Sequence, residues 1–205
     1  MGAAPEGTPW DVYREIHKAM RFALASVTTM AGATEASRPD EVQRLVAEWR
    51  DVQLVLLGHH GHEDDFCDVH VAAHASHLRD QLEAAHVEAD AAIAALDAQA
   101  EALLTCPDDD RWAAVLAFHL SLADFSAMYT NHLRFEELQV MPALQAAMSD
   151  HELEAVTVQI RTSVPPPEMC VFIKYMVPSM NFAERLDMLG GMYQGAPPEV
   201  FEMFR

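Results

Sequence analysis

Cysteine is scarce in this chain of 205 residues, which holds only Cys67, Cys106 and Cys170. Their number is odd, and no two of them form a C-x-x-C pair. Such a set makes neither a disulfide framework nor a thiolate metal knuckle. We therefore expect three buried, reduced thiols.

Positive charge is also scarce, because 13 Lys and Arg residues stand against 32 Asp and Glu residues, for a formal net charge of −19. Binding to nucleic acid or to an anionic membrane requires clustered Lys and Arg. We therefore expect neither as a partner. The acidic excess mainly favours solubility.

Two further kinds of segment are missing. No N-terminal stretch joins a basic start to an apolar core of signal-peptide length, and no apolar run approaches the ~20 residues of a membrane span. No Ser-His-Asp order, Gly-rich phosphate loop or nucleotide fingerprint is present, so hydrolase and kinase functions lack support. We expect a soluble cytoplasmic protein, either a monomer or a homodimer.

What the chain does contain is apolar residues at helical spacing, in a sequence that is about half hydrophobic. They predict four long helices, with Asp40 as the N-cap of the second and a kink or end near Pro142 in the fourth. The predicted ranges are 10–30, 40–63, 77–104 and 111–148, with a loop over 68–76. Short links between long helices predict an all-α, up-down four-helix bundle over residues 8–150.

The C-terminal part has a different composition. Val164 precedes three consecutive prolines, which cannot continue a helix, and we predict a linker over 151–167. Short helices over 169–175 and 182–189 then form a C-terminal extension, 168–205. This extension is rich in Met and Phe, so we expect it to pack on the bundle, where it can act as a lid.

Two His-x-x-x-Glu steps are the most informative pattern in the chain: His59 with Glu63, and His132 with Glu136. Residues four apart on a helix lie on one face, with Cβ atoms roughly 5 to 6 Å apart. An imidazole and a carboxylate at this spacing can bind one ion. Two such steps on facing helices of a bundle point to one place, which predicts a dinuclear metal site.

The other two predicted helices each offer a histidine at a compatible depth, His17 in the first and His86 in the third. The full set then has four imidazoles and two carboxylates, the latter able to bridge two ions. Such donors suit iron, manganese or zinc. Each residue alone also fits an ordinary hydrogen-bonded or surface role, but burying the whole set unpaired is costly, and this favours the metal site.

Several nearby residues remain open between two roles. His60 and His62 can touch a ligand or relay protons, although we expect them to be solvent-exposed. His70 and His74 lie in the predicted loop, where we expect exposure. Two tyrosines close to ligand positions, Tyr13 and Tyr129, can donate to a bound oxygen species or simply pack in the core.

Four strings, IHKAM, HHGHEDD, LEAAHVEAD and HLRFEELQVMPAL, carry a resemblance to a known family. In their order and ligand types they resemble the hemerythrin-like, or HHE cation-binding, family over about residues 8 to 150. The family places His on helix one, His-x-x-x-Glu on helix two, His on helix three and His-x-x-x-Glu on helix four. The last string also has a second acid, Glu137, and a proline, Pro142, at similar positions.

One position departs from the oxygen-carrying hemerythrins, for which the resemblance implies five His and two carboxylates, with two His four apart on helix three. Here the residue four after His86 is Asp90. If Asp90 binds metal, the site gains a carboxylate; if it does not, one position is left to solvent or substrate. Anionic oxygen donors favour ferric iron, so we expect one-way oxidation by dioxygen or peroxide rather than reversible oxygenation.

We therefore expect a non-haem di-iron protein with two oxo- or hydroxo-bridged iron ions, manganese or zinc being the alternatives. It would bind and react with dioxygen or peroxide and can oxidise a small organic substrate. As an enzyme it would be an oxygenase, an oxidase or a peroxide-consuming oxidoreductase, with no catalytic residue beyond the metal centre. The alternatives are a sensor of oxygen, iron or redox state, an oxygen-binding protein without turnover, and a metal that only braces the bundle.

Overall fold

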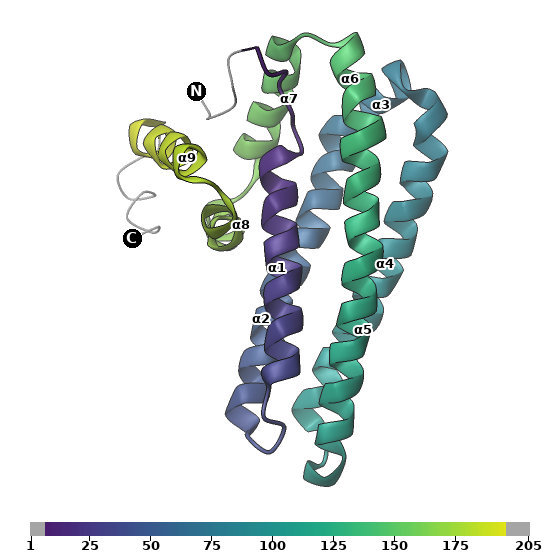
Figure 1. Cartoon of the computed structure of the whole chain (residues 1–205), viewed down its shortest axis with the longest axis vertical. Coiled ribbons are helices and arrows are strands. Elements are labelled where there is room, and N and C mark those ends of the chain that lie inside the picture. Colours follow the sequence, from purple (N-terminus) through teal and green to yellow (C-terminus); the bar gives the residue numbers. More distant parts are fainter. Residues whose placement is uncertain (1–6, 196–205) are drawn as a thin grey trace.

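The computed structural model describes residues 7–195, and every regular element within that range is helical (Figure 1). The predicted all-α class is confirmed. The elements are α1 (Arg14–Ala33), α2 (Pro39–His62), η1 (Glu63–Cys67), α3 (Asp68–His74), α4 (Ser76–Thr105), α5 (Asp108–Phe135), η2 (Glu136–Val140), α6 (Met141–Ala147), α7 (Asp150–Ser163), α8 (Pro166–Ser179) and α9 (Phe182–Gly195). The two η elements are single π turns inside longer helices.

Four long helices run up and down side by side (Figure 1). α1 packs against α2 and α5, and α4 packs against the same two helices on the other side. α2 continues through η1 into α3, and α5 continues through η2 into α6. This is the predicted up-down bundle, with the four predicted long helices in place.

Local sequence explains where α1 and α2 begin. The Asp11 carboxylate accepts hydrogen bonds from the backbone N–H groups of Tyr13 and Arg14, at 3.0 and 3.1 Å, at the start of α1. The prediction of Asp40 as an N-cap is wrong, because α2 begins one residue earlier, at Pro39, with Arg38 as the N-cap. Proline favours the first turn of a helix, where its missing N–H has no partner to lose.

Two other boundary predictions are wrong. The predicted loop over 68–76 is largely helix α3, which the buried side chain of Val71 anchors in a core cluster. His70 and His74 therefore lie on a helix, with stacked rings. Pro142 does not end the fourth helix, because it falls in the first turn of α6, directly after the π turn, where a proline is tolerated. The alternative, a kink at this position, stays a prediction.

The bundle interior holds two apolar clusters with a polar layer between them. In the larger one, Trp49 meets Phe118 and Phe125 edge-on, with ring centroids 6.1 and 6.4 Å apart. The smaller one lies at the end of the π turns and includes Tyr13 and Val140. Each long helix passes from one cluster to the other through a predicted metal ligand, so the candidate site separates the two cores.

The segment after the bundle differs from the prediction in its secondary structure. Most of the stretch predicted as a linker, 151–167, is helical in α7, which begins with a capping box between Ser149 and Glu152. Only Val164 and Pro165 are extended between α7 and α8. The Trp10 indole N–H donates to the Thr157 hydroxyl at 3.0 Å and thereby ties α7 to the start of the chain.

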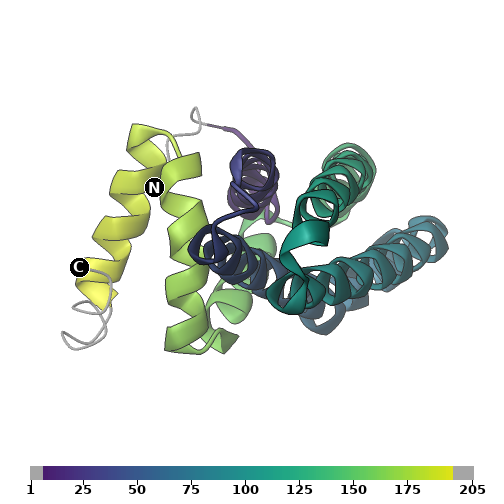
Figure 2. The same ribbon diagram turned by 90° about the horizontal axis from the view of Figure 1, so that it is seen from below.

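Helix α8 crosses the outer side of α1 and α2, and α9 lies beyond it (Figure 2). Lys174 of α8 pairs with Glu48 and Asp51 of α2 at 2.6 and 2.8 Å, and the Tyr175 hydroxyl donates to Glu48 at 2.8 Å. Phe172 packs on Gly58, where an added Cβ would lie 3.0 Å from its ring. The predicted domain boundaries and the lid role stay predictions, and residues 196–205 lie outside the described range.

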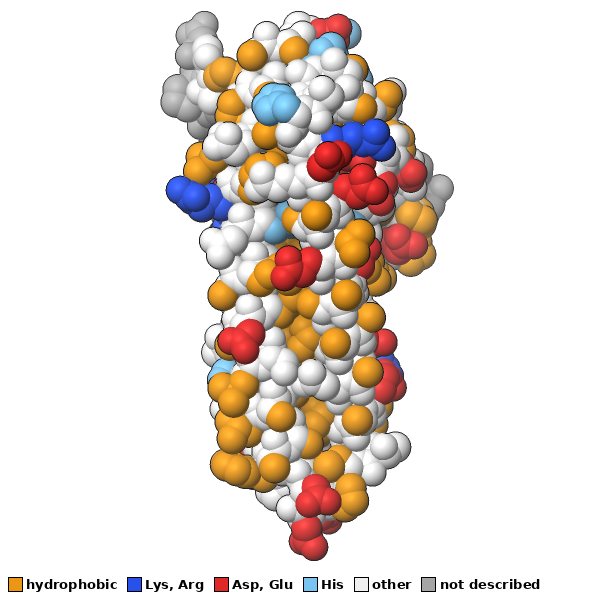
Figure 3. All heavy atoms as spheres, turned by 90° about the vertical axis from the view of Figure 1, so that its right-hand side faces the viewer, with side chains coloured by type: hydrophobic (Ala, Val, Ile, Leu, Met, Phe, Trp, Pro, Cys, Tyr) orange, Lys and Arg blue, Asp and Glu red, His pale blue; other side chains and the backbone are white. Residues whose placement is uncertain are grey.

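By length and composition, one helical stretch of the described chain, Asp108–Ala147, is apolar enough to cross a membrane. Reading the sequence for uninterrupted apolar runs missed it, because Asp124 interrupts the run. In the bundle this stretch packs against α1 and α4. Hydrophobic side chains gather over the lower half of the α4 and α5 side (Figure 3). Trp112, Leu116 and Leu120, in the first half of α5, are exposed.

Candidate metal centre

The structure brings six predicted residues together inside the bundle. Their ligand atoms form two groups, and within each group all of them lie within 4.8 Å of one another. The first group is His17, His59, Glu63 and Glu136, and the second is Glu63, His86, His132 and Glu136. Glu63 and Glu136 belong to both groups. The arrangement therefore offers two adjacent cation positions with two shared carboxylates.

The distances show how the shared carboxylates divide their oxygens. Glu136 Oε2 lies 3.3 Å from His17 Nε2, whereas Oε1 lies 3.2 Å from His132 Nε2. One carboxylate thus faces an imidazole of each group with a different oxygen, as a bridging ligand does. Glu63 Oε2 lies 3.3 Å from His59 Nε2 and 3.2 Å from His86 Nε2. This single oxygen of Glu63 therefore faces a histidine of each group.

The hydrogen-bond state of these atoms tests whether cations fit. The Nε2 atoms of all four histidines and both oxygens of each carboxylate are buried, and no residue within 7–195 is a hydrogen-bond partner for them. Unpaired buried polar atoms are rare and costly, and so many at one place require another explanation. Two cations bound among them would satisfy every one of these atoms. The donor set therefore fits a dinuclear metal centre.

Each shared carboxylate is the first residue of a π turn, Glu63 in η1 and Glu136 in η2. Such turns are rare and occur frequently at functional sites, because the wider turn changes the direction of the side chains that follow. Both turns connect the helix of a His-x-x-x-Glu step to a short helix, α3 or α6. No residue pattern marks a π turn, so reading the sequence missed both.

A second set of contacts fixes the orientation of His17. Its Nδ1 donates to Glu137 Oε1 at 3.0 Å, which leaves Nε2 facing the shared carboxylates. Arg21 holds Glu137 with two further hydrogen bonds, of 2.6 and 2.9 Å. Burial raises the pKa of Glu137, but the hydrogen bonds from His17 and Arg21 outweigh it and lower the pKa to about 2. Reading the sequence missed the role of Arg21. Its position one turn after His17 was the only sign in the sequence that the two side chains lie on the same face of α1.

The expected exposure of His60 is wrong, because its side chain is buried, with 3% exposed. Its Nδ1 donates to Asp90 Oδ1 at 2.8 Å, and its Nε2 accepts from the Tyr129 hydroxyl at 2.9 Å. The ring stacks on His86, with centroids 4.6 Å apart, and a ligand atom of His60 also converges with His86 and His132. Asp90 thus binds His60 from a half-exposed position outside the convergent groups, and its role as a metal ligand stays a prediction.

The charges of the site are balanced by protons when no cation is bound. Burial opposes protonation of His17 and His86, but the negative charges of the carboxylates close to them outweigh it and raise their pKa values to about 9 and about 10. Burial and the charge of Glu136 raise the pKa of Glu63 to about 8. Burial lowers the pKa of His132 to about 4. Cations that bind here must therefore displace protons.

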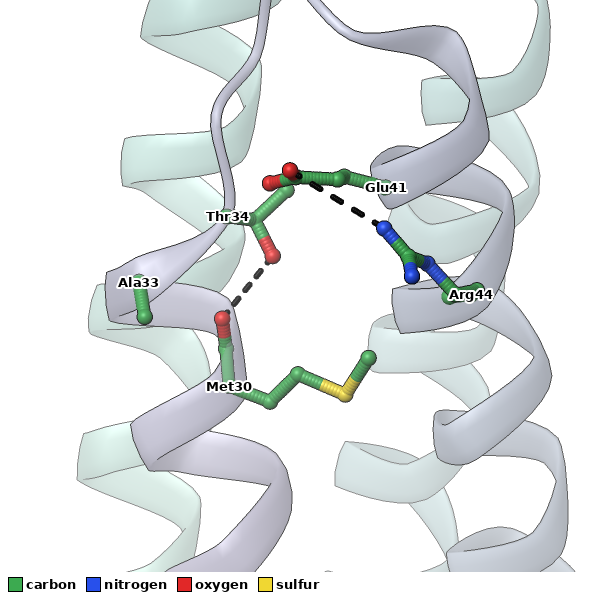
Figure 4. A pocket seen from close by; sticks show the side chains of 5 residues that line it. All are labelled: Met30, Ala33, Thr34, Glu41 and Arg44. Atoms are coloured by element: carbon green, nitrogen blue, oxygen red, sulfur yellow. Dashed lines mark hydrogen bonds and ion pairs between the residues drawn. The ribbon is translucent and has the colours of Figure 1, made fainter.

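The remaining histidines lie away from this layer. His62 packs against Phe172 of α8, and His119 is within hydrogen-bond distance of the Thr28 carbonyl. A surface hollow of about 160 Å³ lies between the end of α1 and the start of α2 and is lined by Met30, Ala33, Thr34, Glu41 and Arg44 (Figure 4). None of the six convergent residues lines it, so we do not connect it with the metal centre.

Comparison with known proteins agrees with this geometry. No curated protein and no solved structure matches the chain. A family model described as the hemerythrin HHE cation binding domain matches residues 8–144. That range contains all four long helices and all six convergent residues, and the buried His and Glu clusters are typical of a hemerythrin di-metal site. The chain therefore belongs to the hemerythrin HHE cation-binding family.

Proposed function

We propose that this chain is a non-haem di-iron protein that reacts with dioxygen or peroxide and can oxidise a small molecule. The observation that supports this most directly is the sharing of Glu63 and Glu136 between the two ligand groups. Shared carboxylates place two ions side by side, and reactive dinuclear centres have ions about 3.5 to 4 Å apart. A metal that served only to brace the bundle would not need two adjacent positions.

The donor set guides the choice of metal. Four imidazole nitrogens and two carboxylates suit iron, manganese or zinc, and we assign iron because anionic oxygen donors stabilise its ferric state. When bound, an iron pair supplies electrons to dioxygen or peroxide. Each group provides two imidazoles and two shared carboxylates, which leaves room at each ion for a small molecule.

The protein residues hold and enclose this centre. Glu137 and Arg21 orient His17, and the two apolar clusters on either side exclude bulk water from the polar layer. Tyr129, His60 and Asp90 form a hydrogen-bonded chain that reaches the surface, and the His60 ring in it stacks on His86 of the second ligand group. The interior favours a small reactant, such as dioxygen or hydrogen peroxide, over a bulky one.

The test is to load metal-free protein with iron(II) under anaerobic conditions, measure the iron per chain, and record the visible spectrum after oxygen is added and then under vacuum. We expect two irons per chain and an irreversible change to an oxidised spectrum. Full reversal under vacuum would instead identify an oxygen-binding protein. Less than one iron per chain, or no reaction with oxygen or peroxide, would contradict the proposal.

A sensing function is the second candidate, and one contact favours it. Lys18, the residue after His17, pairs with Glu184 of α9 at 2.6 and 2.7 Å and so links the metal layer to the C-terminal helices. Metal occupancy that moves α1 would alter this link. Limited proteolysis with and without iron tests the idea, with Lys18→Gln as the variant that lacks the link. Equal cleavage of α9 in all four samples would exclude sensing by this route.

A further inference from the structure

One buried hydroxyl beside the metal layer has no hydrogen-bond partner in the part of the chain that the structure describes. Tyr13 is 1% exposed, and its hydroxyl oxygen is buried and unpaired. The buried tyrosines Tyr129 and Tyr175 differ from it, because their hydroxyls are bonded to His60 and Glu48. Leaving a buried hydroxyl unpaired costs stability. Packing alone would have been served better by phenylalanine.

The position of Tyr13 relates this hydroxyl to the candidate site. Tyr13 is the N-cap of α1, and its carbonyl accepts the N–H of His17 at 2.9 Å, so the two residues lie one turn apart. Their rings stack with centroids 4.9 Å apart. Because α1 runs opposite to α2 and α5 (Figure 1), one turn before His17 is the level of Glu63 and Glu136.

The surroundings of Tyr13 support the same placement. Its hydroxyl lies near enough to Glu63 and Glu136 to interact electrostatically with both, and a phenol hydroxyl is a hydrogen-bond donor. Its ring packs in the smaller apolar cluster, which includes Val71, Val140 and Met141. Among the described residues this wall offers the hydroxyl no acceptor. The donor is neutral and fixed in position.

We propose that the Tyr13 hydroxyl donates a hydrogen bond to the small molecule or anion that takes the remaining position at the metal pair, on the side of the π turns. This inference rests on the proposed function. The ligand class is a diatomic or triatomic species with an acceptor atom, such as dioxygen, peroxide or azide. Tyr13 acts as a positioning residue that favours such a ligand over an apolar one.

The test uses full-length protein loaded with iron and oxidised, with sodium azide as the probe. Wild type is compared with Tyr13→Phe, which removes only the hydroxyl, and with Tyr175→Phe, a matched control that loses its hydroxyl far from the metal layer. Azide affinity is measured from its charge-transfer absorption. The loss of one hydrogen bond to an anion predicts ~10-fold weaker binding in Tyr13→Phe and no change in Tyr175→Phe.

A vibrational measurement separates a hydrogen bond from a packing effect. In wild type, the resonance Raman band of bound azide shifts when H2O is replaced by D2O, and in Tyr13→Phe this shift disappears. The wild-type shift needs no variant, so the proposal remains testable if Tyr13→Phe does not fold. A wild type without the shift, or a Tyr13→Phe protein with unchanged azide affinity, overturns the inference.

The same experiment separates this inference from the proposed function. Wild type that retains two irons per chain but binds no azide overturns the role of Tyr13 and leaves the di-iron centre intact. Wild type that retains no iron overturns both. Metal-free Tyr13→Phe should unfold at the same denaturant concentration as wild type or higher, because the substitution removes an unpaired buried hydroxyl. A marked loss of stability would mean that the hydroxyl has a structural partner and would overturn the inference.

Discussion

The two ligand groups of the metal centre share their carboxylates but differ in their surroundings. His17 of the first group is fully buried and is held through Glu137 by the guanidinium of Arg21. His86 of the second group is the most exposed of the six convergent residues, at 7%, and its ring stacks on His60. Charged residues of α1 and η2 thus hold the first group in place, whereas the second group borders a hydrogen-bonded chain to the surface.

This difference indicates that the two cation positions are not equivalent. A carboxylate on the far nitrogen of a ligating histidine fixes the ring and increases its basicity, which strengthens metal binding. The first position is therefore expected to bind the tighter ion. The second position has the less buried imidazole and the path through His60 and Asp90, so it is expected to exchange its ion more readily.

The largest expected effect comes from the carboxylate that both groups share. Glu136→Gln removes an anionic oxygen from each position and leaves an amide among His17, His86 and His132. We expect the variant to retain less than one iron per chain after dialysis, where wild type retains two. Metal analysis measures this directly, with Glu101→Gln as a control that makes the same change at an exposed ion pair with Arg50. If Glu136→Gln retained one tightly bound iron, the two positions would not share this residue.

A smaller effect should distinguish the two positions. Glu137→Gln removes the charge that holds His17 but touches no residue of the second group, so it should weaken only the tighter ion, by about 10- to 100-fold. Competition with a chelator resolves the two affinities. Arg44→Gln, which removes an exposed arginine from α2, serves as the control. Equal weakening of both positions would mean that the bracing of His17 does not set the difference between them.

The sequence predicted the four histidines of the two ligand groups better than it predicted the residues that contact them. His17, His59, His86 and His132 could be found because helical spacing and depth place them on inward faces of four helices. Arg21 of α1 and Glu137 of η2 are more than 100 residues apart, and the spacing of Arg21 one turn after His17 does not by itself reveal their contact. His60 was assigned to solvent because three histidines lie within four residues at the end of α2, and their spacing does not reveal which of them face inward.

The π turn η1 explains why the residues after Glu63 were also predicted wrongly. After Glu63 the helical period changes over η1, so the faces of the residues up to His74 cannot be extrapolated from α2, and the segment was predicted as a loop. The prediction of the fold did not require the positions of the π turns. Its four long apolar stripes and short links determine an up-down bundle whichever way the residues after Glu63 turn.

The pH dependence of stability tests the protonation of both groups. The pKa values of His17 and His86 are raised from 6.5 to about 9 and about 10, so the folded, metal-free chain keeps protons that the unfolded chain loses. Their contribution to stability is fully present below pH 6.5 and is lost as the pH rises through 9 to 10. Chelated protein should therefore unfold at lower urea concentration at pH 9 than at pH 6.5.

Metal binding should show the opposite trend over the same range. Because cations displace these protons, iron or zinc affinity should rise from pH 6.5 to pH 9. Urea titrations of chelated and zinc-loaded protein at both pH values measure the two trends together. Chelated protein whose stability is constant or increases over this range would mean that His17 and His86 are already neutral at pH 6.5.

The smallest expected effect concerns Asp90. Its substitution tests whether the second cation position includes a carboxylate ligand near the surface. Asp90 is half exposed and bonds His60 at 2.8 Å, so Asp90→Asn replaces a charged acceptor by a neutral one without emptying a ligand position. We expect two irons per chain, and a decrease in unfolding free energy of about 0.5 to 1 kcal/mol, because partly exposed pairs contribute little. Metal analysis and urea unfolding measure both quantities. Loss of one iron in Asp90→Asn, with Asp97→Asn unchanged as the control on the same helix, would make Asp90 a ligand and would extend the second position by one carboxylate toward solvent.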